Sequence, residues 1–138
     1  MSLRAFAQPR LWRGLFVLMI IGVFAGSLLP TSRLPDVDLM HNDKLLHFSA
    51  YFLLMAFAVQ LRDAKAEWSR AAFGLLLMGI AIEFLQHQSG LRRADIRDVY
   101  ANAAGVVAGA LIAWTPARAW LLALDQRFNK ASPPTRLS

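Results

Sequence analysis

Residues 71–86 read AAFGLLLMGIAIEFLQ, an apolar run that contains one carboxylate, Glu83. This composition is typical of a helix that crosses a lipid bilayer, although the length of 16 residues would also fit a buried helix of a soluble protein. Ionisable side chains are costly to place in hydrocarbon, so they usually face a partner, a wet cavity or a functional site. Glu83 is therefore the first candidate functional residue.

Three further apolar blocks occupy residues 11–29, 45–61 and 99–115. Four such blocks in a chain of 138 residues that is 57% apolar leave too little polar surface for a soluble protein. The sequence therefore predicts an all-α integral membrane bundle of four transmembrane helices, forming a single membrane domain over residues 1–130. The absence of cysteine excludes a disulfide frame and thiol chemistry.

The chain has a net charge of +6, but its Lys and Arg residues alternate between the two sides of the predicted membrane. This pattern fits membrane topology better than a nucleic-acid partner. Lys and Arg precede the first apolar block, lie between the second and third, and follow the fourth. Because cytoplasmic loops are rich in basic residues, both termini are expected to be cytoplasmic. The outer loop with Arg92, Arg93 and Arg97 breaks this rule. An anionic headgroup or pairing with Asp95 and Asp98 would explain it.

The C-terminal region predicts a helix on the inner membrane surface over residues 117–129, because Thr115 and Pro116 are typical of a helix start. The alternative is a kinked continuation of the fourth span. Residues 131–138 are expected to be a disordered tail. The predicted lipid-facing residues are Trp120, Leu121, Leu124 and Phe128, and the predicted water-facing residues are Arg118, Asp125, Arg127 and Lys130.

Polar residues on three of the predicted helices recur at spacings of three or four, so each set shares one helix face near the outer end. Since polar groups in hydrocarbon turn inward and pair, we expect one wet pocket that opens to the outer side. Gly105 and Gly109 would let another helix approach this face closely. The sets are Asp43, Lys44, His47 and Tyr51; Glu83, Gln86 and His87; and Asp98 and Asn102.

These residue types suit several chemistries, and a purely structural role stays open for each. Glu83 and His47 are candidate catalytic residues for proton transfer, with Asp43 and Asp98 as orienting residues or ion ligands. A divalent metal is a further option, although no spacing such as HExxH supports it. Alternatively, Asp98 or Asp95 caps a helix. The candidate substrate-binding residues, including a basic set suited to phosphate, are Lys44, Arg92, Arg93, Gln86, Asn102 and Tyr51.

The order of these motifs resembles the VanZ-like family. Residues 43–48 read DKLLHF, residues 82–86 read IEFLQ and residues 98–105 read DVYANAAG. They are similar to the family's ordered set D-K-x-x-H, E-x-x-Q and D-x-x-x-N-x-x-G, with Arg92 or Arg93 at the position of an intervening arginine. The resemblance implies a small multi-pass protein of the bacterial inner membrane, from a family named for a teicoplanin-resistance determinant.

Three functions remain open at the level of sequence. The first is an envelope protein whose outward pocket binds, with or without modifying it, an anionic lipid or a lipid-linked cell-envelope intermediate, with a link to glycopeptide resistance implied by the resemblance. The second is a non-catalytic membrane scaffold or surface-modulating protein whose polar cluster only specifies helix packing. The third is a small transporter, which would require a homo-oligomer because four short helices enclose little space.

Overall fold

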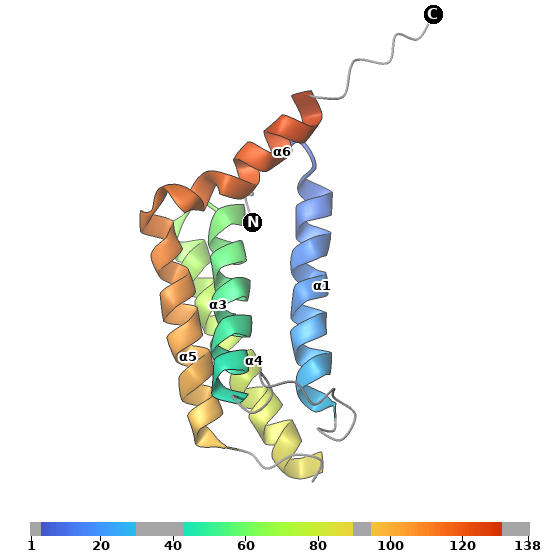
Figure 1. Cartoon of the computed structure of the whole chain (residues 1–138), viewed down its shortest axis with the longest axis vertical. Coiled ribbons are helices and arrows are strands. Elements are labelled where there is room, and N and C mark those ends of the chain that lie inside the picture. The colour runs from blue at the N-terminus through green and yellow to red at the C-terminus, as the bar shows by residue number, and fades with distance from the viewer. Residues whose placement is uncertain (1–3, 30–42, 90–94, 131–138) are drawn as a thin grey trace, which may run out of the picture.

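The computed structural model describes residues 4–29, 43–89 and 95–130, and this part of the chain contains helices and short connections without a strand (Figure 1). Four helices are long and apolar enough to cross a membrane: α1 (Pro9–Leu28), α3 (Asp43–Leu61), α4 (Lys65–Ser89) and α5 (Ile96–Leu111), the last extended by the 3₁₀ turn η2 (Ile112–Trp114). The predicted all-α bundle is confirmed. Helix α4 begins before the apolar run from which it was predicted.

Helix α3 is the central helix of the bundle, and α5 packs directly on its backbone. A Cβ atom added to Gly109 would lie 2.6 Å from the carbonyl oxygen of Phe52, and one added to Gly105 would meet the carbonyl oxygen of Phe48 still closer. Only glycine permits such an approach. The close contact predicted for this small-residue face is therefore present, and it holds the polar residues of α5 against α3.

Helix α1 lies on the other side of α3 from α5 and is less enclosed (Figure 1). Near its start, the ring of Phe16 stacks on Phe57 with a centroid distance of 5.9 Å. Near its end, the carbonyl oxygen of Ser27 accepts a hydrogen bond of 2.7 Å from Gln86 Nε2. Val17, Leu18 and Ile21 are exposed, as expected for a helix that faces lipid.

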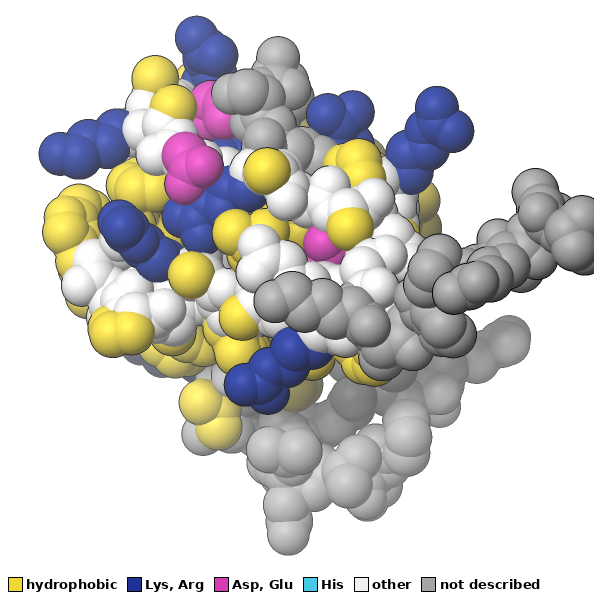
Figure 2. All heavy atoms as spheres, turned by 90° about the horizontal axis from the view of Figure 1, so that it is seen from above, with side chains coloured by type: hydrophobic (Ala, Val, Ile, Leu, Met, Phe, Trp, Pro, Cys, Tyr) yellow, Lys and Arg dark blue, Asp and Glu magenta, His cyan; other side chains and the backbone are white. Residues whose placement is uncertain are grey.

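The chain breaks at Thr115, whose backbone is extended, and continues through the 3₁₀ turn η3 (Pro116–Ala119) into α6 (Trp120–Lys130). Helix α6 lies across the end of the bundle at which α1 begins and α3 ends (Figure 1). Seen from that end, Figure 2 shows Lys and Arg side chains around the rim. This basic end is the one that the sequence predicts to be cytoplasmic, and the orientation in the membrane stays a prediction.

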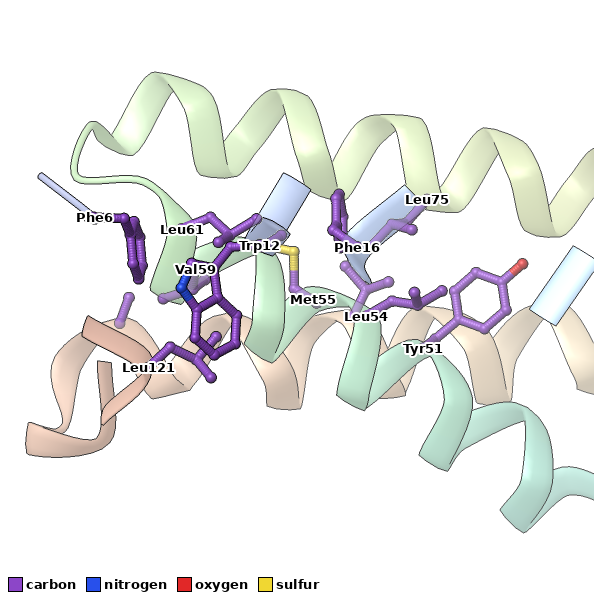
Figure 3. Close-up of a cluster of buried hydrophobic side chains, with 13 residues drawn as sticks. Phe6, Trp12, Phe16, Tyr51, Leu54, Met55, Val59, Leu61, Leu75 and Leu121 are labelled. Atoms are coloured by element: carbon purple, nitrogen blue, oxygen red, sulfur yellow. The ribbon is translucent and has the colours of Figure 1, made fainter. Parts of the chain in front are cut away.

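Two expectations for α6 were wrong. Leu121, predicted to face lipid, and Asp125, predicted to face water, are both buried against the bundle. Figure 3 shows Leu121 clustered with Trp12 and Val59 in the apolar core. The Asp125 carboxylate accepts a hydrogen bond of 2.8 Å from Trp12 Nε1. These partners lie far away in the sequence, so the local pattern of α6 could not reveal them.

Candidate functional site

The end of the bundle opposite α6 is called here the polar end, because charged side chains from α3, α4 and α5 meet there. Helices α3 and α5 begin at this end and α4 finishes at it (Figure 1). The polar cluster defined by these contacts consists of Asp43, Lys44, His47, Glu83, Asp95, Asp98 and Asn102.

His47 lies at the centre of the polar cluster and is buried. Its Nδ1 is 3.1 Å from Asn102 Oδ1. Because an amide oxygen only accepts hydrogen bonds, Nδ1 is the donor. Its Nε2 faces two carboxylate oxygens, Asp98 Oδ2 at 3.5 Å and Asp43 Oδ1 at 3.7 Å. The sequence motifs on α3 and α5 therefore meet around one imidazole ring.

Lys44 joins two carboxylates of α5. Its Nζ lies 2.7 Å from Asp98 Oδ1 and 2.8 Å from Asp95 Oδ2. In the structure it pairs with protein carboxylates, and its predicted role in binding an anionic substrate stays a prediction. Asp95 also accepts a hydrogen bond of 3.0 Å from the backbone N–H of Arg97 and is the N-cap of α5. The hydrogen bond from Lys44, followed by that from Arg97, holds the pKa of the Asp95 carboxyl below its ordinary value.

Asp95 rather than Asp98 caps α5, which settles the alternative left open by the sequence. Asp98 lies in the first turn, where its side chain is free to face His47 and Lys44. The candidate site residues predicted from sequence did not include Asp95, although it contacts Lys44. A signal was available in the sequence. Asp95 and Asp98 lie three residues apart at the start of a helix, and Lys44 is a basic residue that could pair with both.

Glu83 is buried at the same end, but its hydrogen bond goes to Asp95 and not to His47. Its Oε2 accepts a hydrogen bond of 3.0 Å from the backbone N–H of Asp95. Its Oε1 is buried and has no hydrogen-bond partner within residues 4–29, 43–89 and 95–130. The charges of Asp98, His47 and Asp43 act on Glu83 electrostatically. Glu83 and His47, predicted as a proton-handling pair, therefore belong to one charged network but not to one hydrogen bond.

Tyr51 extends the polar cluster into the bundle. It is almost fully buried, and its hydroxyl has no hydrogen-bond partner among the described residues. A Cβ atom added to Gly79 would lie 3.2 Å from that hydroxyl and 2.9 Å from Asn102 Nδ2. Gly79, which sequence reasoning missed, thus makes room for both side chains one helical turn before Glu83. The spacing of Gly79 and Glu83 on one helix face was the available signal.

The sequence of this chain matches a protein-family model. The VanZ/LLP1 family model matches residues 7–121. The chain belongs to the VanZ/LLP1 family. This confirms the resemblance inferred from the motifs, and the match also includes α1 and the start of α6. Comparisons with curated proteins and with solved structures found no match.

Not all predicted site residues of the VanZ/LLP1 chain join the polar cluster. Gln86 is buried, but its hydrogen bond goes to Ser27 of α1. His87 is exposed at the end of α4. Arg92 and Arg93 lie outside the described residues, so their assignment to an anionic headgroup stays a prediction.

One set of potential metal ligands is present in this VanZ/LLP1 fold, within the part that the structure describes. It consists of Asp43, His47 and Asp98, whose ligand atoms all lie within 4.8 Å of one another. Glu83 and His87 are not members of this set. Imidazole nitrogen and carboxylate oxygen are common ligands of divalent transition metals.

Proposed function

We propose that this VanZ/LLP1 protein binds, in its polar cluster, the phosphate-bearing headgroup of an anionic lipid or of a lipid-linked cell-envelope intermediate. The observation that carries the proposal is the burial of Glu83 and Asp98 at the meeting point of three helices. Buried charged groups in membrane helices are rare and usually mark a substrate or ion path. Their position at helix ends supports a location of the cluster near the level of lipid headgroups.

The basic groups at this end supply the recognition chemistry. The Lys44 side chain is 41% exposed, so it is accessible from outside while it bridges Asp95 and Asp98. A phosphate would compete for the Lys44 ammonium, which is a common phosphate ligand. Arg97 is exposed on the first turn of α5 and adds a second cation beside Asp95. Arg92 and Arg93 would add two further cations to Lys44 and Arg97.

Chemical modification of the bound headgroup forms a further part of the proposal. Glu83 is the candidate proton acceptor, because its Oε1 is buried without a hydrogen-bond partner in the described chain. Turnover on an envelope intermediate would connect the protein to glycopeptide (teicoplanin) resistance, the phenotype after which the family is named.

A non-catalytic scaffold is the second candidate, and one observation favours it. Lys44 already has both Asp95 and Asp98 as partners, and His47 is hydrogen-bonded to Asn102, so much of the cluster is internally paired. Paired polar groups of this kind also specify helix packing in membranes. A scaffold would keep its activity when the cluster is replaced by residues that preserve the fold.

Native mass spectrometry of the purified protein separates the two candidates, because it detects lipids that remain bound. We expect phosphate-bearing lipids on the wild type and on the exposed-site control His87→Ala, and at least a tenfold loss on Glu83→Gln and Asp98→Asn. Folding of each variant is checked by tryptophan fluorescence. Equal lipid retention by all folded variants would contradict the proposal.

Lipid extracts of cells that lack or overproduce the protein then test turnover. A defined lipid product that depends on Glu83 indicates an enzyme, and a change in teicoplanin susceptibility with the same dependence links that product to resistance. Unchanged lipid extracts together with an unchanged susceptibility would remove modification and resistance from the proposal and leave binding.

A further inference from the structure

The separations between His47 Nε2 and two carboxylates are compatible with ligands of one metal ion. Its Nε2 lies 3.5 Å from Asp98 Oδ2 and 3.7 Å from Asp43 Oδ1, both longer than an ordinary N–H···O hydrogen bond. Zn²⁺ binds imidazole nitrogen and carboxylate oxygen at about 2.0–2.2 Å, so two ligands of one tetrahedral ion lie about 3.4 Å apart. The separations between nitrogen and oxygen therefore leave room for a cation between them.

The tautomer of His47 is also that of a ligand. Its Nδ1 donates to Asn102 Oδ1, so in the neutral ring the lone pair is on Nε2 and points toward the two carboxylates. Metal-binding histidines usually donate their other ring N–H to an oxygen in this way. Asn102 is almost fully buried on the α5 face that contacts α3, so the ring orientation is fixed by packing.

One oxygen of the buried Asp98 carboxylate faces His47 rather than Lys44. Lys44 contacts Oδ1 of Asp98 and leaves Oδ2 directed at His47. A buried carboxylate is unfavourable unless its charge is paired. A cation between Asp98 Oδ2 and His47 Nε2 would pair this carboxylate on the side that Lys44 does not contact.

Unpartnered polar atoms beside the cluster point to the same conclusion. Glu83 Oε1 and the Tyr51 hydroxyl are buried and have no hydrogen-bond partner in the described ranges. Glu83 is within electrostatic range of all three potential ligands, Asp43, His47 and Asp98. A water molecule bound to a metal is a strong donor and would supply a partner for a carboxylate oxygen of this kind.

We infer that Asp43, His47 and Asp98 bind a divalent first-row transition metal of the Zn²⁺ or Mn²⁺ type. One imidazole and two carboxylates suit these ions, and three protein ligands leave positions open for water or a phosphate oxygen. The inference rests on the proposed function for the identity of that last ligand. It also explains how an acid-rich cluster would bind an anion, because the metal would supply the positive charge that meets the phosphate.

Metal binding is tested on the full-length protein in detergent, stripped with a chelator and titrated with Zn²⁺ or Mn²⁺ in the absence of added lipid. We expect stoichiometric retention by elemental analysis and a rise in the midpoint of thermal unfolding. His47→Ala and Asp98→Asn should abolish retention, and Asn102→Ala should weaken it by about 10- to 100-fold. The matched controls His87→Ala and Asp63→Asn, both exposed, should retain the metal as the wild type does.

If the ligand variants do not fold, the metal site can still be tested on the wild-type protein. Co²⁺ substituted into the stripped protein should give the visible absorption bands of nitrogen and oxygen coordination. The absence of these bands together with the absence of Zn²⁺ and Mn²⁺ retention would overturn the inference. So would metal retention that depends on His87 and not on His47.

The two proposals fail in different ways. Metal retention without any bound phosphate lipid would refute the proposed function and leave the metal site standing. Equal lipid retention before and after chelation, with no metal bound at any stage, would refute the metal site and leave lipid binding standing. Comparison of vesicle-derived phospholipid with inorganic phosphate as the added ligand then distinguishes a membrane headgroup from a free phosphate.

Discussion

His47 Nδ1 and Asn102 Oδ1 are 3.1 Å apart in a buried hydrogen bond that joins α3 to α5. The two residues come from separate sequence motifs, 55 positions apart. Their contact brings the carboxylates of Asp43 and Asp98 to the same imidazole ring. The sequence motifs of α3 and α5 are therefore parts of one structural unit.

Removal of the amide at position 102 should destabilise the protein measurably. Asn102→Ala leaves His47 Nδ1 buried without an acceptor, which costs about 1–3 kcal/mol. The midpoint of thermal unfolding in detergent, followed by tryptophan fluorescence, measures the effect. Asn129→Ala removes an exposed asparagine of α6 and should change the free energy of unfolding by less than about 0.5 kcal/mol. Similar losses in both variants would show that the buried hydrogen bond contributes little.

The contact between α3 and α5 should tolerate no side chain at its closest point. A methyl group at Gly105 would overlap the carbonyl of Phe48, and backbone cannot move aside cheaply. Gly105→Ala is expected to lower the free energy of unfolding by about 1–3 kcal/mol or more. It should also weaken every property that depends on the polar cluster, since the helices would separate.

Gly74→Ala is the matched control for Gly105→Ala. A Cβ atom at Gly74 would meet nothing within 4 Å, so the added methyl group lowers the entropy of the unfolded chain without a clash. Alanine in an exposed helix interior is favoured over glycine by about 0.5–1 kcal/mol. The two variants should thus shift the unfolding midpoint in opposite directions. A stabilised Gly105→Ala variant would contradict the close packing of α3 and α5.

The anchoring of α6 gives a further prediction. The Asp125 carboxylate accepts hydrogen bonds from Trp12 Nε1 and from the backbone N–H groups of Ala7 and Gln8. Asp125→Ala leaves these donors without their acceptor and should cost at least about 1–3 kcal/mol. Limited proteolysis should then cut α6 faster than in the control Gln126→Ala, which alters an exposed residue of the same helix. Equal cleavage rates would mean that α6 is held by apolar contacts alone.

Local periodicity was sufficient to predict the helices and the polar stripes. Apolar blocks mark membrane helices because hydrocarbon excludes polar groups, and residues at spacings of three or four share a face in any α-helix. His47, Glu83 and Asp98 could therefore be assigned to one end of the bundle before the structure was known. Gly105 and Gly109 likewise indicated which face of α5 meets another helix.

The pairing of individual side chains could not be predicted in the same way. It depends on the rotation of each helix about its axis and on residues far apart in the chain. Lys44 forms ion pairs with Asp95 and Asp98, and Gln86 donates a hydrogen bond to Ser27 of α1. The sequence predicted that Asp125 faces water, because its hydrogen-bond partner Trp12 lies over 100 positions away, near the start of the chain.

Acid should weaken the polar end through Asp95. Its pKa is lowered in the folded protein, chiefly by the hydrogen bond from Lys44. A carboxyl with a depressed pKa contributes stability above its unfolded pKa, about 3.9, and this contribution is lost as pH falls through the folded value. Unfolding midpoints of the wild type and of Asp95→Asn should therefore differ at pH 7 and converge below about pH 4. Asparagine also caps helices well, so the comparison isolates the charge. A constant difference across this pH range would show that the Lys44–Asp95 ion pair does not contribute to stability.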